Sequence, residues 1–275
     1  MSVVRAAVIQ MDSGSNRKEN LSKIETYIEK AVHMGAAFVI LPETADYIGP
    51  DFTRNSWRIE EAEEFYGSLA EKYKIYLHCG SITEQTDQKP RNTTLFFEPS
   101  GACLGHYSKL HMFDIQVENG PFYKESDAIQ PGNRIAVAKT SIGTFGFAIC
   151  YDIRFGEMFR LMAQNGARVF CICADFTWNT GKAHWETLLR TRAIENTCYI
   201  LASNQTGKKH AYTAFGHSMI IDPWGNIMKR CREGEQIITA ELDMDDVNQI
   251  RQQLPSLKNI RQDIYQLSGS VEIWQ

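Results

Sequence analysis

The sequence predicts an α/β protein, a four-layer α-β-β-α sandwich built from two pseudo-repeated halves. Short apolar runs alternate with segments of helical periodicity, this order occurs twice, and no linker rich in proline, glycine or serine separates the halves. Strands that alternate with helices indicate parallel strand pairs joined by crossover helices, which bury a sheet on both faces. We therefore expect two sheets packed face to face within one domain, with the helices outside them.

The first half runs in the order strand, helix, strand, helix, strand and ends in a hairpin. Its first helix places Leu21, Ile24 and Ile28 at helical spacing, and Gly35 is a plausible stop after it. The predicted elements are strands at 3–10, 37–41 and 75–80, helices at 18–33 and 59–73, and a hairpin over 95–107.

The second half repeats this order, and the two halves are most similar in sequence at residues 34–39 and 165–170. The predicted elements are strands at 144–149, 168–173 and 198–203, helices at 156–165 and 183–196, and a hairpin that begins at 218–222. We expect one domain over residues 1–245 and a C-terminal tail over 246–275. The tail shows a short helical pattern ended by Pro255, then becomes polar and irregular, and we expect it to pack on the domain or on a partner subunit.

The composition argues against several functional classes. The chain has 275 residues and a net charge of -4, with scattered Lys and Arg, so neither nucleic acid nor an anionic membrane is an expected partner. The sequence shows no signal-peptide pattern and no bilayer-length apolar run, and it has an odd count of seven cysteines. These features predict a cytoplasmic protein with free thiols. Without Cys-x-x-Cys pairs, clustered His or a phosphate-binding glycine loop, no metal and no cofactor are expected.

Three reactive side chains follow predicted strands, which is where α/β sheets collect functional groups. Cys150 ends a strand just before a helix, as a nucleophile at a sharp turn does; the alternative is a structural thiol. Glu43 follows a buried strand and suits a general base; the alternative is a helix-capping or loop acid. Lys109 follows the first hairpin and suits a partner for a thiolate and an oxyanion; the alternative is a solvated loop lysine.

These residues lie in three segments, Leu41-Pro42-Glu43, Tyr107-Ser108-Lys109-Leu110-His111 and Cys150-Tyr151-Asp152-Ile153-Arg154-Phe155-Gly156-Glu157. In this order, the segments resemble the catalytic blocks of the nitrilase (carbon–nitrogen hydrolase) superfamily. Further blocks at 181–186, 190–196 and 216–225 also match, so the resemblance covers nearly the whole chain. It implies the same four-layer sandwich and a triad of Glu43, Lys109 and Cys150. It also implies that Glu125 stands at the place of a second family glutamate.

The resemblance implies a mechanism without a cofactor. Glu43 would take the thiol proton of Cys150, and the thiolate would attack an amide carbonyl. Lys109 and the backbone N–H of Tyr151 would stabilise the oxyanion. Release of ammonia would leave a thioester for water to hydrolyse, and Glu125 would position Lys109 or the substrate.

Within the superfamily, the sequence looks nearest to the branch of omega-amidases and deaminated glutathione amidases. The resemblance implies a small 2-oxo acid amide as substrate, with its carboxylate bound by Arg154 unless that residue pairs with an internal acid such as Glu157. Phe176 and Thr180 match pocket positions of the branch. Asp175 departs from the branch pattern and would add negative charge near a site for anions.

Other assignments stay open on the sequence alone. A nitrilase would use the same triad, and an N-carbamoyl amidohydrolase belongs to the same superfamily. An inactive interaction protein on the same fold is the alternative outside enzymes. Relatives usually form homodimers or larger homo-oligomers, so the resemblance implies a homo-oligomer here as well.

Overall fold

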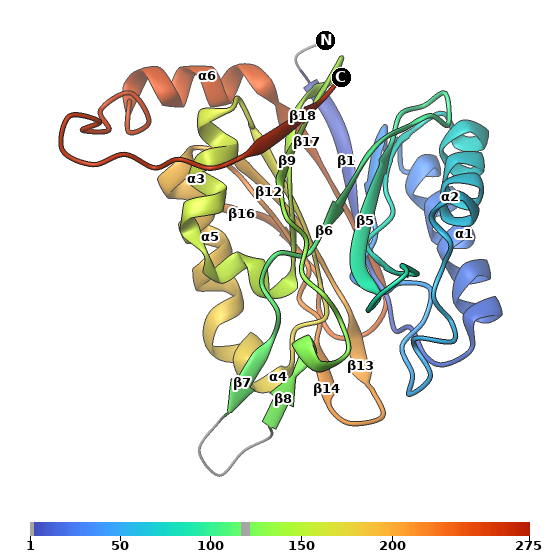
Figure 1. The fold of residues 1–275 in the computed structure, drawn as a ribbon. Helices are drawn as coiled ribbons and strands as arrows, with labels where there is room; N and C mark the ends of the chain where they lie inside the picture. Colours follow the sequence, from blue (N-terminus) through green and yellow to red (C-terminus); the bar gives the residue numbers. More distant parts are fainter. Residues whose placement is uncertain (1–2, 117–121) are drawn as a thin grey trace.

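The computed structural model describes residues 3–116 and 122–275. It contains two seven-stranded sheets packed face to face, with helices on the outer face of each (Figure 1). The first sheet has the order β17-β1-β2-β3-β5-β4, and β6 pairs with β5; the second has the order β16-β15-β12-β11-β10-β9-β18. The predicted four-layer α-β-β-α sandwich is therefore confirmed.

The first sheet carries its helices on one side. Strands β1 to β3 pair in parallel, which the crossover helices between them make possible. The elements are β1 (Val3–Gln10), α1 (Arg17–His33), β2 (Phe38–Ile40), α2 (Ile59–Tyr73), β3 (Tyr76–His78), β4 (Ile82–Glu84), β5 (Arg91–Phe97), β6 (Cys103–Ser108) and β17 (Gln236–Asp243).

The second sheet has a parallel centre formed by β10, β11 and β12. The elements are β9 (Ile135–Thr140), β10 (Gly143–Ile149), α3 (Gly156–Gln164), β11 (Val169–Ala174), α4 (Trp178–Thr180), α5 (Glu186–Asn196), β12 (Tyr199–Asn204), β15 (Met219–Ile221), β16 (Ile227–Arg230), α6 (Met244–Gln253) and β18 (Val271–Trp274). Two small hairpins lie outside both sheets: β7 (Asp114–Gln116) with β8 (Phe122–Lys124), and β13 (Thr206–Lys208) with β14 (Thr213–Phe215).

Alternation along β1 explains why the strand is apolar on both faces. Val8 belongs to the core between the two sheets, whereas Ile9 belongs to the core under helices α1 and α2. In the central core, Phe38 of the first sheet stacks on Phe145 of the second, with ring centroids 5.1 Å apart. This apolar contact fixes the two sheets against each other and therefore the strand ends that carry the polar residues.

The structure differs from the sequence prediction at several elements, among them strand β9, which the sequence did not predict. The helix predicted from residue 183 begins as α5 at Glu186, after α4 and a π-helical turn over Gly181–Trp185. Strand β17 comes from the second half but pairs with β1 of the first. The stretch predicted to be irregular after Pro255 ends in β18, which pairs in parallel with β9. A domain boundary at residue 245 stays a prediction.

The described cysteines carry no disulfide, and six of the seven thiols are buried, in agreement with the prediction of free thiols. None of the helices among the described residues has the length and apolar character needed to cross a membrane.

Candidate active site

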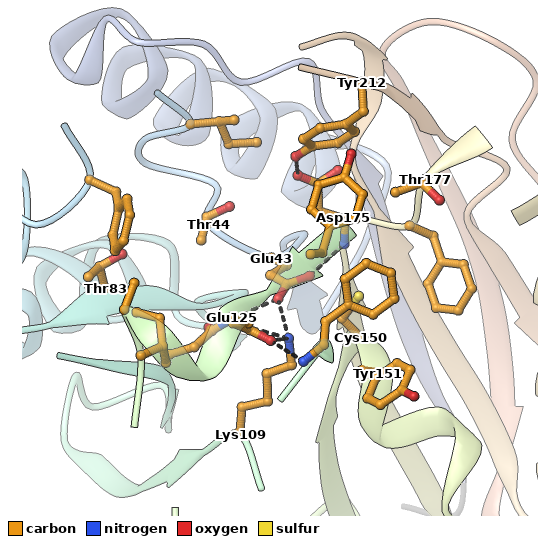
Figure 2. A pocket seen from close by; sticks show the side chains of 18 of the residues that line it. Glu43, Thr44, Thr83, Lys109, Glu125, Cys150, Tyr151, Asp175, Thr177 and Tyr212 are labelled. Atoms are coloured by element: carbon orange, nitrogen blue, oxygen red, sulfur yellow. Dashed lines mark hydrogen bonds and ion pairs between the residues drawn. The ribbon is translucent and has the colours of Figure 1, made fainter. Parts of the chain in front are cut away.

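A cavity of about 420 Å³ opens where strands of both sheets end. Glu43 lies just after β2, Lys109 follows β6 directly, Cys150 follows β10 directly and Asp175 follows β11 directly. All four line the cavity, and Figure 2 shows the side chains of Glu43, Lys109 and Cys150 close together, whereas the Asp175 carboxylate points to Tyr212. The carboxyl ends of these strands thus bring together residues that are far apart in the sequence.

Cys150 occupies a sharp turn between a strand and a helix. Its φ angle is 48°, in the left-handed region that side chains with a Cβ seldom adopt, and a short 3-10 helix over Cys150–Arg154 begins there. The fully buried Asp152 holds this turn, because its carboxylate accepts hydrogen bonds from the Ile149 N–H at 2.9 Å and the Tyr107 hydroxyl at 2.7 Å. The turn therefore presents the sulfur at the cavity, as predicted for a nucleophile.

Glu43 is buried at 5% exposure, and both of its carboxylate oxygens are held. Oε1 accepts a hydrogen bond of 2.7 Å from the Asn92 side chain, and Oε2 accepts one of 2.7 Å from the backbone N–H of Asp175. The Lys109 ammonium lies 3.5 Å from Oε1. The carboxylate therefore has little freedom to rotate, which suits a group that must face one thiol.

Lys109 is held mainly by the second glutamate. Its ammonium donates to both oxygens of Glu125, at 2.9 and 2.8 Å, and the Phe113 N–H donates to Glu125 Oε2 at 2.6 Å. Glu125 begins a short 3-10 helix, so its side chain reaches the lysine from a separate segment of the chain (Figure 2). Glu43, Lys109 and Glu125 are thus joined by ion pairs on the wall of the cavity that Cys150 also lines, and the catalytic roles of the four residues stay a prediction.

Burial and charge set the protonation states of this cluster. Burial, together with the nearby carboxylate of Glu43, raises the pKa of the Cys150 thiol well above its usual value, although Lys109 and the Asp175 N–H oppose the shift. Burial alone would lower the pKa of Lys109, but Glu43 and Glu125 raise it well above its usual value. These shifts favour a protonated thiol and a charged ammonium near neutral pH.

The residues predicted to bind substrate, together with Tyr151, which was predicted to stabilise the oxyanion, also line the cavity. Tyr151, Arg154, Phe176 and Thr180 all contribute to its wall. The Arg154 guanidinium lies over the rings of Tyr151 and Phe176, at 5.4 and 5.5 Å from their centroids. Among the described residues, Arg154 and Glu157 do not form an ion pair. The predicted oxyanion role of the Tyr151 N–H stays a prediction.

Three residues of the site were not singled out from the sequence. Asn92 in β5 holds the Glu43 carboxylate, Asp152 holds the turn at Cys150, and Tyr212 in the β13–β14 hairpin donates a hydrogen bond to Asp175. Asp152 lies inside the Cys150 block, where its position was visible. Asn92 and Tyr212 reach the site only through strand pairing and a hairpin, which left no local signal in the sequence.

Among the residues that the structure describes, one group of potential metal ligands occurs, and it lies outside the cavity. One ligand atom each of Glu63, Cys103 and His106 lies within 4.8 Å of the others. His106 Nε2 already lies 2.7 Å from Glu63 Oε1, so these two side chains are hydrogen-bonded to each other. The expectation of no metal site stays a prediction.

The family model of carbon–nitrogen hydrolases matches residues 5–252. The chain is 37% identical over 270 residues to a deaminated glutathione amidase of Synechocystis, an alignment that covers 92% of this chain and 97% of the relative. It is 34% identical over 269 residues to human omega-amidase NIT2, covering 96% of this chain and 98% of that protein. The structure of Saccharomyces cerevisiae Nit3, a member of branch 10 of the nitrilase superfamily, superimposes with a TM-score of 0.86 at 32% identity, covering 94% and 97% of the two chains.

The chain therefore belongs to the carbon–nitrogen hydrolase family, the nitrilase superfamily. It is a hydrolase that acts on carbon–nitrogen bonds other than peptide bonds. The two curated relatives above carry amidase names, which places this chain beside amidases within the family.

Proposed function

We propose that the protein is a cysteine-dependent amidase that hydrolyses an amide of a small carboxylate-bearing 2-oxo acid through a thioester. The observation that carries the proposal is the convergence of Glu43, Lys109 and Cys150 on one cavity wall, with Glu125 bound to the lysine. Two relatives of this chain, a deaminated glutathione amidase and an omega-amidase, have names that support this substrate class.

The first step is general-base activation of the thiol. Because the pKa of Cys150 lies well above its usual value, the sulfur does not ionise by itself near neutral pH. Glu43 is the group placed to accept the thiol proton, and its carboxylate is fixed by Asn92 and the Asp175 N–H. The thiolate then attacks the amide carbon, and the carbonyl electron pair moves to oxygen.

The second step needs a cation near the new oxyanion. The Lys109 ammonium is buried at 2% exposure and lies beside Glu43, so it stabilises negative charge in a region of low dielectric constant. The Tyr151 N–H is the proposed second donor. Collapse of the tetrahedral intermediate breaks the C–N bond, and Glu43 returns its proton to the departing amine. Glu43 then activates water, which hydrolyses the thioester and restores the thiol.

Arg154 is the proposed ligand of the substrate carboxylate. Its guanidinium lines the cavity and lies over two aromatic rings. One of its terminal nitrogens is 3.3 Å from His184 Nδ1, and the remaining N–H donors would bind the carboxylate. Phe176 and Thr180 would form the wall beside it. The pocket therefore has a reacting end at Cys150 and a carboxylate-binding end at Arg154.

A substrate panel tests this proposal. Ammonia or amine release is measured with 2-oxoglutaramate, deaminated glutathione, an N-carbamoyl amino acid and a simple nitrile, using the wild type and Cys150→Ala. Turnover of a 2-oxo amide by the wild type and none by the variant is the expected result. Turnover of the nitrile or the N-carbamoyl compound alone would replace the proposal with one of those activities. No turnover, together with a Cys150 thiol inert to iodoacetamide, would favour an interaction protein.

We also propose a cytoplasmic homodimer or larger homo-oligomer. The exposed side chains of Ile194 and Trp224 support this, because they lie on neighbouring segments: Gly225 packs against Ile194. Light scattering coupled to size exclusion measures the oligomeric state, and a monomeric mass at micromolar concentration would contradict it.

A further inference from the structure

Asp175 contacts the proposed reacting groups through its backbone. Its backbone N–H donates to Glu43 Oε2 at 2.7 Å and also faces the Cys150 sulfur, whose pKa it lowers. The residue follows β11 directly and lines the cavity. Its backbone is therefore held at the reacting groups, and its carboxyl group belongs to the same cavity wall.

The carboxyl group of Asp175 is only half satisfied. Tyr212, from the loop of the β13–β14 hairpin, donates a hydrogen bond to its Oδ2 (Figure 2). Within the described parts of the chain, Oδ1 is buried and has no hydrogen-bond partner. A buried carboxylate oxygen without a partner costs free energy, which either a proton or a ligand donor recovers.

The charged groups around Asp175 do not supply a dedicated cation. Lys109 is bound by Glu125 and lies beside Glu43, and the Lys209 ammonium donates to Asp12 Oδ1 at 2.8 Å and to the Ser13 carbonyl at 2.9 Å. Burial raises the pKa of Asp175 to about 7; Lys209, Tyr212 and Lys109 oppose this shift, and Glu43 adds to it. The carboxyl group therefore changes its charge near neutral pH.

We propose that Asp175, held by Tyr212, is a specificity-determining residue that makes the pocket select amides by charge. An anionic amide binds well only while the Asp175 carboxyl is protonated, and a neutral amide binds in either state. Two negative charges in one buried pocket repel each other, whereas a protonated carboxyl removes the repulsion. The inference deepens the proposed function and rests on it, since it concerns which 2-oxo acid amide the same site accepts.

The test compares the pH dependence of the Michaelis constant for two substrates. Wild type and Asp175→Asn are assayed from pH 5.5 to 8.5 with anionic 2-oxoglutaramate and with neutral butyramide. If only the protonated carboxyl admits the anion, a pKa of about 7 predicts that the wild-type KM for 2-oxoglutaramate rises about tenfold between pH 6 and pH 8. The KM for butyramide is expected to be the same at pH 6 and pH 8, because this substrate carries no charge. In Asp175→Asn the KM of both substrates is expected to be independent of pH, because the amide of asparagine does not titrate.

Tyr212→Phe gives an independent arm. The tyrosine hydrogen bond favours the carboxylate form, so its removal moves the inflection of the wild-type profile to a higher pH. Circular dichroism and thermal melting check that both variants fold. If the KM for 2-oxoglutaramate rises with pH by the same factor in the wild type and in Asp175→Asn, the inference is overturned. The proposed function is unaffected by that result.

A binding measurement separates the two possible failures. Calorimetric titration with 2-oxoglutarate, at pH 6 and pH 8, needs no turnover. Wild-type affinity that falls about tenfold between these pH values, but stays constant in Asp175→Asn, supports the charge selection even if no amide in the panel is hydrolysed. Equal pH dependence in the two proteins, or no binding to either of them, overturns it.

Discussion

Asn92 offers a sharp test of how the proposed base is held. Its side-chain N–H donates to Glu43 Oε1 at 2.7 Å from a position buried in β5. A hydrogen bond to a charged group contributes about 1.5–3 kcal/mol. Because about 1.4 kcal/mol corresponds to a tenfold change in rate, Asn92→Ala is expected to lower kcat/KM by about 10- to 100-fold. The Asp175 N–H still holds the other oxygen, so activity is not abolished.

The assay is steady-state amide hydrolysis on proteins whose fold is verified by circular dichroism. Asn92→Asp is a near-isosteric companion that replaces the donor by a second carboxylate, so it should be slower than Asn92→Ala. Asn196→Ala removes a second buried asparagine, at the end of α5, whose side-chain N–H donates to the Arg192 carbonyl. This control should lose stability but keep its rate. Asn92→Ala at the wild-type rate, or Asn92→Asp faster than Asn92→Ala, would refute the reasoning.

Three further predictions concern charge, pH and packing. Glu125→Gln removes the main anionic partner of Lys109 and should lower kcat by about tenfold or more in the same assay, so an unchanged kcat would contradict that role. Burial lowers the pKa of His78 to about 3. The unfolded chain then binds more protons between pH 3 and about pH 6.5, and stability falls as pH drops through this window. In urea titrations, the free energy of unfolding of the wild type should fall by about 2 kcal/mol more than that of His78→Gln between pH 7 and pH 5. Equal losses in the two proteins would contradict the role of His78. Trp274 stacks on Phe147, with ring centroids 4.9 Å apart. Trp274→Ala should therefore lower the free energy of unfolding by about 3–5 kcal/mol in the same titrations, and a loss below about 1 kcal/mol would show that β18 is dispensable.

The sequence predicted the layers because the two periodicities are strong in this chain. The apolar run of β1 and the helical spacing of α1 were both visible, and α2 was predicted at the bounds observed, Ile59–Tyr73. Strands β17 and β18 were missed because each depends on a partner far away in sequence. Val3 pairs with Asp243, and Ile135 pairs with Val271, and no local pattern records such a pairing.

The site was predicted unevenly for a related reason. Glu43, Lys109 and Cys150 each follow a strand directly or closely, so their place at a sheet edge could be inferred from local order. The partners that tune them could not, because Asn92 and Tyr212 enter the site through hydrogen bonds across elements. Charge partners and burial thus set the protonation states, and both depend on contacts that exist only in the folded structure.

The pairing of β17 with β1 has a consequence for biosynthesis. Val3–Gln10 leaves the ribosome well before its antiparallel neighbour, Gln236–Asp243, which emerges only after almost all of the second half. Until then, one edge of the first sheet presents unpaired backbone groups, which attract strands from other chains. A nascent chain arrested before residue 236 is therefore the species most exposed to aggregation and to chaperone capture, and closure of that edge becomes a late, long-range event in folding.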